Sequence, residues 1–259
     1  MKGLKMTYVY LAILSLLVFA SASQAAGIAD TKHNLSTSGT GAIHATSGTA
    51  EICVFCHTPH GADTNVAAPL WNRAQTSATF SVYSSSTLDA LPTQPTGTSL
   101  ACLSCHDGTV AFDAIRNLPG SGGYTNTPSV DGTSTWTFVG TPDKKMPDGI
   151  TLIGTDLRND HPISMIFADA RSPSSTSASQ TAGFRTITSG PGSKKCVGNG
   201  ITDCSDPAAL PLSSATIGGS ADYVQCTSCH DPHRSDTPTF LRKSNDGSAL
   251  CLTCHVKDG

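Results

Sequence analysis

The sequence predicts a protein of mostly irregular structure, with short α-helices and minor β-structure. Only 14% of the 259 residues are charged and 6% are aromatic, so a conventional hydrophobic core is thin. The chain has 24 glycines and 15 prolines, which favour turns and loops between its cysteine motifs. Each of those motifs needs only a short helical turn. Short strands are expected at residues 135–139, where side chains alternate, and at the β-prone run 150–153.

The motif Cys-x-x-Cys-His occurs four times, at residues 53–57, 102–106, 226–230 and 251–255. This spacing is the attachment signature of c-type haem, because two thiols add to the two vinyl groups on one edge of the porphyrin. The histidine directly behind the second thiol then lies under the ring and ligates the iron. Zinc sites built from cysteine pairs need no such histidine, which makes zinc or plain disulfides the weaker interpretation.

We therefore expect four haem c groups. The thiols that would attach them are Cys53, Cys56, Cys102, Cys105, Cys226, Cys229, Cys251 and Cys254. The histidines that would ligate the irons from the proximal side are His57, His106, His230 and His255.

The first 25 residues are predicted to be a secretory signal peptide. Lys2 and Lys5 precede an apolar run at 7–19, and small residues follow that suit cleavage near Ala25. The run is too short to span a bilayer in the mature protein and no second one follows, so no integral membrane segment is expected. Export agrees with the motifs, because haem is attached to them outside the cytoplasmic membrane. The net charge of −3, about −5 without the two lysines, argues against nucleic acid as a partner.

The motifs form two pairs, and the leading motif of each pair continues as Cys-x-x-Cys-His-x-Pro-His. This repeat predicts an N-terminal dihaem module at 26–110, a haem-free connecting region at 111–220 and a C-terminal dihaem module at 221–259. Cys196 and Cys204 lie outside the motifs. In an exported protein they are expected to form a local disulfide in the connecting region, with free thiols or an intermolecular bridge as the alternatives.

Five histidines remain as candidates for the distal side of the irons. His60 cannot ligate the iron held by His57, because it lies three residues away on the same side of the macrocycle. The simplest assignment gives His60 to the second haem and His233 to the fourth. His33 and His161 are then candidates for the first and third haems.

His44 is the spare histidine in this assignment, and Met146 or Met165 is the alternative type of axial ligand. Two histidine ligands leave no open coordination position, so such an iron transfers electrons without binding substrate. We therefore expect no enzyme activity. A multihaem oxyanion reductase is the competing interpretation, and it requires at least one iron with an open site.

Several segments resemble one known family: residues 32–36, 52–61, 69–73, 102–108, 160–164 and the final motif pair. The chain resembles the tetrahaem outer-surface c-type cytochromes of metal-reducing bacteria, a doubled Cys-x-x-Cys-His family that polymerises into extracellular nanowires. The resemblance implies a coil-rich protein around a continuous stack of four bis-histidine haems. His33 and His161 match histidines of the family pattern.

The same resemblance implies partners and a location. It implies a homopolymer on the outer surface or outside the cell, in which one subunit supplies a distal histidine to its neighbour. Redox partner proteins and extracellular acceptors such as metal oxides or electrodes would exchange electrons with it. The alternative is a monomeric periplasmic tetrahaem electron carrier.

Overall fold

The fold was analysed in a computed structural model that describes residues 27–256, except 87, 89, 121, 133, 169–182 and 221. The predicted signal peptide at 1–25 lies outside the described residues. Within the described part of the chain, no helix is long and apolar enough to cross a membrane.

Most of the described chain is irregular, as predicted, and its helices are short. The α-helices are α2, Gly97–His106, and α4, Cys226–Cys229. Single 3₁₀ turns lie at Ile28–Asp30, Cys53–Phe55, Pro191–Ser193, Pro238–Phe240, Asp246–Ser248 and Cys251–Thr253. All four Cys-x-x-Cys-His motifs lie on such turns or helices.

The strands have two or three residues each and join distant parts of the sequence. They are β1 Ser81–Val82, parallel to β2 Asp156–Leu157, and β3 Met165–Ile166, antiparallel to β7 Tyr223–Val224. The longest sheet is antiparallel and has β5 Lys195–Val197 between β4 Ile187–Ser189 and β6 Leu210–Pro211.

The strands predicted at 135–139 and 150–153 are wrong. Phe138 makes only an isolated bridge with Ala45, and residues 150–153 form a turn and coil. Ile150 is fully exposed, so this run has no apolar face to bury. Residues 135–139 are joined to residues 44–46 by two backbone hydrogen bonds and bury Phe138, but the pairing ends after this one bridge, which is too short to form a strand.

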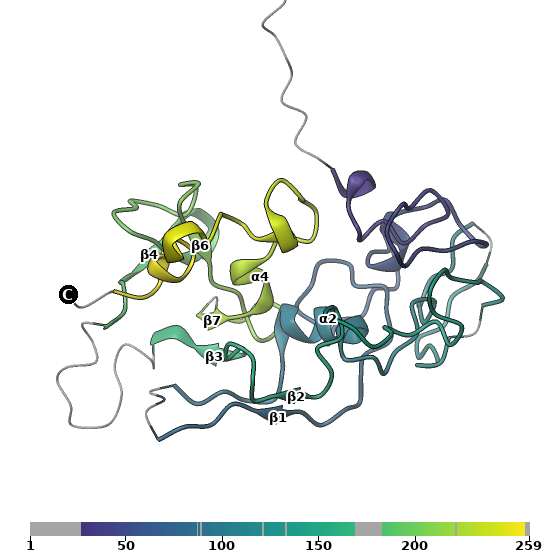
Figure 1. The fold of residues 1–259 in the computed structure, drawn as a ribbon, viewed down its shortest axis with the longest axis horizontal. Helices are drawn as coiled ribbons and strands as arrows, with labels where there is room; N and C mark the ends of the chain where they lie inside the picture. The colour runs from purple at the N-terminus through teal and green to yellow at the C-terminus, as the bar shows by residue number, and fades with distance from the viewer. Residues whose placement is uncertain are drawn as a thin grey trace, which may run out of the picture.

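The two ends of the molecule are built from different parts of the chain (Figure 1). The N-terminal segment gathers at one end with the teal segment near residue 130. The sheet β4–β6 and the C-terminal segment form the other end. Helices α2 and α4 lie between them, and their motifs belong to the two different predicted modules.

The hydrophobic core is divided into several small clusters that border the motif cysteines. One cluster, which includes Phe55 and Phe112, packs against Cys56 and Cys105. A second cluster, which includes Phe167, packs against Cys254. Buried apolar side chains therefore pack against three of the attachment thiols, those of Cys56, Cys105 and Cys254, and the division into small clusters agrees with the thin core expected from composition.

Direct contacts between α2 and α4 hold the two motif pairs together. The Thr98 and Thr227 hydroxyls are 2.6 Å apart, and the Cys226 backbone N–H donates to Ser99 Oγ at 3.0 Å. Gln225, which is 1% exposed, donates to Thr96 Oγ1 at the start of α2. Helix α4 is thus fixed to the helix that carries the second motif.

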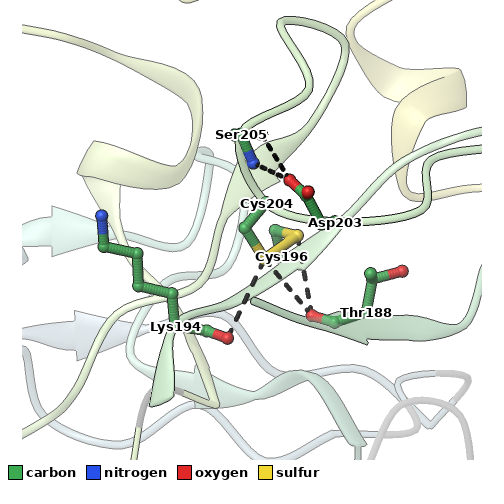
Figure 2. Close-up of a disulfide and its surroundings, with 6 residues drawn as sticks. All are labelled: Thr188, Lys194, Cys196, Asp203, Cys204 and Ser205. Atoms are coloured by element: carbon green, nitrogen blue, oxygen red, sulfur yellow. Dashed lines mark hydrogen bonds between the residues drawn. A yellow bond between two sulfur atoms is a disulfide. The ribbon is translucent and has the colours of Figure 1, made fainter. Parts of the chain in front are cut away.

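The connecting region contains the disulfide predicted between Cys196 and Cys204 (Figure 2). Cys196 lies in the central strand β5, and Cys204 follows eight residues later, so the bond closes a short loop that leaves the sheet. Both sulfurs lie near the Thr188 carbonyl of the adjacent strand β4. The bond therefore secures a loop-rich segment to the longest sheet.

Candidate haem-ligating site

Each Cys-x-x-Cys-His motif forms one helical turn that places its thiols and histidine together. The backbone N–H of the histidine donates to the carbonyl of the first cysteine in His57, His230 and His255, at 2.7, 2.9 and 2.9 Å. His106 ends α2, so the second motif occupies its last turn. Residues three apart on a turn share one face, so both thiols of a motif point the same way.

The leading motif of each pair is braced by a later segment, and the two braces match. Residues 69–73 lie beside the first motif, where the Asn72 N–H donates to the Cys56 carbonyl at 2.9 Å. Residues 239–243 lie beside the third motif, where the Arg242 N–H donates to the Cys229 carbonyl at 2.8 Å. The duplication recognised in the motifs therefore extends to their supporting segments.

Backbone carbonyls hold three of the four proximal histidines. The Nδ1–H of His57 donates to the Pro69 carbonyl at 2.7 Å, that of His106 to the Thr151 carbonyl at 2.7 Å and that of His230 to the Thr239 carbonyl at 2.8 Å. A carbonyl oxygen only accepts, so the proton is on Nδ1 and Nε2 carries a free lone pair. Metal-ligating histidines are typically oriented in this way.

Three of the four proximal histidines, His57, His106 and His255, each face a second histidine from elsewhere in the chain. The ring centres are 6.2 Å apart for His33 and His106, and 6.0 Å apart for His57 and His233. They are 6.4 Å apart for the third pair, His161 and His255. Metal–imidazole bonds are about 2 Å long, so two rings that ligate one metal from opposite sides have centres about 6 Å apart. The described histidines therefore fit an iron between the members of each pair.

The pairing differs from the one expected from the sequence. His33, not His60, faces His106 of the second motif, and His233 faces His57 of the first motif instead of His255 of the fourth. His161, which was expected with His33 at the first and third haems, faces His255 of the fourth motif. The sequence argument assumed that a distal histidine serves the other motif of its own pair. Packing of α4 on α2 brings the modules together instead, so partners come from the opposite module or from outside both motifs.

Three histidines face no other histidine ring within the described residues: His230, His44 and His60. His44 is half-buried, and its Nδ1–H donates to the Gly41 carbonyl at 2.7 Å. His60 is exposed. The backbone carbonyl of His60 accepts from the Thr58 hydroxyl and the Asn117 amide, at 2.9 and 2.7 Å, so its position is fixed although its ring is not.

The environment of the thiols disfavours a zinc site. No group of three or more His, Cys, Asp or Glu side chains within the described part of the chain converges as a protein-only metal site requires. Trp71 Nε1 is buried without a partner, and its ring lies 6.4 Å from that of His57. An acceptor on a bound group at the first motif would satisfy it.

Residues 220–259 match the family model described as doubled CXXCH motif. This range contains both C-terminal motifs. No curated protein matches the chain. The doubled motif indicates covalently bound c-type haem, and with it a multihaem c-type cytochrome that transfers electrons.

The residues that sequence reasoning missed act mainly through their backbones. Pro69, Thr151 and Thr239 orient proximal histidines with a carbonyl oxygen, which every residue type has. No side-chain signal distinguishes them in the sequence. Arg73 was also missed as a structural residue, although it lies in one of the segments that carry the family resemblance.

Proposed function

We propose that the protein binds four haems, each ligated by two histidines, and conducts electrons along them. The observation that carries this proposal is the set of three facing histidine pairs, each with the separation that an iron between two imidazoles requires. Bound haem supplies an iron that alternates between the ferric and ferrous states. The chain's own residues attach it, fix its axial ligands and keep substrate from the iron, so no catalytic step is expected.

Contacts between neighbouring motifs indicate the order of the four sites along the molecule. Cys56 and Cys105 border the same apolar cluster, which brings the first and second motifs together. The Cys226 backbone N–H donates to Ser99 Oγ at 3.0 Å and the Thr98 and Thr227 hydroxyls are 2.6 Å apart, which joins the second motif to the third. The Lys243 ammonium, in the segment beside the third motif, donates to the Thr253 hydroxyl of the fourth motif at 3.0 Å, which brings these two motifs together. This supports a row of haems in sequence order.

The third motif supports assembly into a filament, because His230 lacks a histidine partner within the described chain. We assign its distal ligand to His60 of a neighbouring copy. His60 and His233 occupy the same position in the repeated pattern, and His233 faces the leading motif of the opposite module. If His60 likewise serves the leading motif of the opposite module, its target is the third motif, which carries His230. His60 is exposed, so it is accessible to another copy of the chain.

Electron microscopy of the exported holoprotein tests this assembly. Haem-positive filaments on the cell exterior are expected from the wild type and from His44→Ala. His60→Ala is expected to give discrete particles whose haem content is unchanged. Discrete wild-type particles retained in the periplasm would favour the monomeric carrier, and loss of filaments in His44→Ala but not in His60→Ala would overturn the assignment of His60.

A ligand-binding titration tests the absence of catalysis. If every iron has two histidine ligands, carbon monoxide added to the reduced filament leaves the visible spectrum unchanged, and nitrite is not consumed. In the particles formed by His60→Ala, one haem in four is expected to bind carbon monoxide. Carbon monoxide binding by the wild-type filament, together with nitrite turnover, would favour the reductase instead.

A further inference from the structure

Two consecutive residues beside the third motif have backbone conformations that their side chains disfavour. Thr239 has φ +56° and Phe240 has φ +61°, in the left-handed region that β-branched and aromatic residues rarely adopt. Such conformations persist only where the surrounding structure fixes them, and they concentrate at functional sites. The pair is thus a strained segment that needs an explanation.

Each residue of this pair contacts a different ligand histidine. The Thr239 carbonyl accepts from His230 Nδ1, at 2.8 Å. The Phe240 ring stacks on His33, with ring centres 4.3 Å apart and an angle of 26° between the planes. The equivalent position beside the first motif, in residues 69–73, is Leu70, which also has a positive φ but is 54% exposed and carries no aromatic ring. The stacking of an aromatic ring on a histidine therefore distinguishes residues 239–243 from residues 69–73.

The contacts of His33 fix the plane of its ring. Besides stacking on Phe240, it donates Nδ1–H to the Pro232 carbonyl at 3.2 Å. Its partner His106 is fixed by the Thr151 carbonyl. The two imidazole planes are 83° apart, whereas those of His57 and His233 are 14° apart.

We infer that Phe240 is a positioning residue that holds the His33 imidazole perpendicular to His106 and thereby sets the electronic structure of the second haem. This inference rests on the proposed bis-histidine function. It assigns a crossed ligand arrangement to the second haem and, from the 75° angle between His161 and His255, to the fourth. The first haem receives a nearly parallel arrangement.

The two arrangements differ in a measurable property of ferric iron. Each imidazole interacts through its π-system with one of two iron d orbitals, depending on the direction of the ring plane. Parallel planes act on the same orbital and separate the two in energy, which gives a rhombic spectrum with three resolved g values. Crossed planes act on both alike, which leaves them nearly equal in energy and gives one strongly shifted signal at low field. Axial ligands and the contacts that orient them are the protein's means of tuning such an iron.

Low-temperature electron paramagnetic resonance of the filament tests the inference. Samples are poised at successive potentials so that few haems are ferric at once and coupling between neighbours is small. We expect both signal types in the wild type. His33→Met should remove part of the low-field signal, and His233→Met should remove a rhombic one.

Phe240→Leu removes the stacked ring but keeps an apolar side chain, and it should move the low-field signal assigned through His33→Met toward the rhombic type. Phe240→Tyr keeps the stacked ring and should give the wild-type spectrum. Phe184→Ala is the matched control, because Phe184 lies 4.7 Å from His255 and should leave the His33 signal unchanged. Haem content is measured for every variant.

A low-spin spectrum without the low-field signal, or an unchanged spectrum in Phe240→Leu, would overturn the inference. The first of these outcomes needs only the wild type, so it holds even if a variant does not fold. High-spin signals from the wild-type haems would instead overturn the proposed bis-histidine function, which distinguishes the two failures.

Discussion

Replacing Arg73 with lysine should strongly destabilise the N-terminal end of the molecule. Arg73 is 1% exposed, and within the described residues no carboxylate pairs with it. Its guanidinium uses all of its donors on uncharged acceptors, which are Ser104 Oγ at 3.3 Å and the carbonyls of Phe55, Phe112, Ser104 and Ala111 at 3.4, 2.7, 3.4 and 2.8 Å. It thereby joins the first two motifs to the segment that follows α2.

The magnitude follows from the number of donors. A lysine ammonium has three donors in place of five, so at least two buried acceptors lose their partner. Each buried group left unpaired costs about 1–3 kcal/mol, so Arg73→Lys should lower the free energy of unfolding by about 3 kcal/mol. Arg158→Lys is the matched control, since Arg158 is 67% exposed and its pair with Asp156 is screened by water, so the pair contributes little to stability.

Urea unfolding of the holoprotein, followed by far-ultraviolet and Soret circular dichroism, measures both variants against the wild type. If the free energy of unfolding falls with urea at the same slope in all three proteins, each exposes a similar surface area on unfolding and the free energies can be compared. If Arg73→Lys differs from Arg158→Lys by less than about 1 kcal/mol, the guanidinium does not satisfy these carbonyls and the reasoning is refuted.

Three further outcomes are expected. Changing Cys196 and Cys204 to serine together should lower the free energy of unfolding by about 2.5 kcal/mol, because the closed loop is short; calorimetry measures this, and loss of bound haem in that variant would contradict a purely structural disulfide. Burial raises the pKa of Asp222, but the Lys195 ammonium and Ser220 hydroxyl outweigh it and hold the pKa below its usual value. Its ionised form therefore stabilises the fold above about pH 4, and this contribution is lost as the pH falls further. Asp222→Asn should therefore make the melting temperature fall less steeply below about pH 4 than in the wild type. An unchanged pH dependence of the melting temperature would argue against the ion pair. Excess chelator should leave the absorption spectrum and stability unchanged, because covalent attachment retains the haem; unfolding by chelator would favour zinc.

The motif chemistry could be predicted from the sequence because its spacing is dictated by a covalent reaction. The positions of the thiols and proximal histidines need no knowledge of the fold, and the structure places each motif on one helical turn. The disulfide was predictable because Cys196 and Cys204 were the cysteines left over. Low charge and frequent glycine and proline likewise predicted the irregular fold.

The distal pairing could not be predicted, because it depends on packing between distant segments. The contact of Thr98 with Thr227 brings α4 onto α2, and neither threonine has a spacing rule that marks it. His33 reaches His106 only because Phe240 and Pro232 of the other module hold it there. The strand expected at 135–139 is reduced to a single bridge for a related reason, since alternation of side chains does not determine how far a distant segment such as 44–46 pairs with it.

Mass spectrometry of the denatured holoprotein tests the central claim most directly. Because thioether bonds survive denaturation, four haems should remain on each chain, one for each motif. A mass that equals the bare chain, or the chain with only the C-terminal pair of haems, would contradict the account of four covalently bound groups.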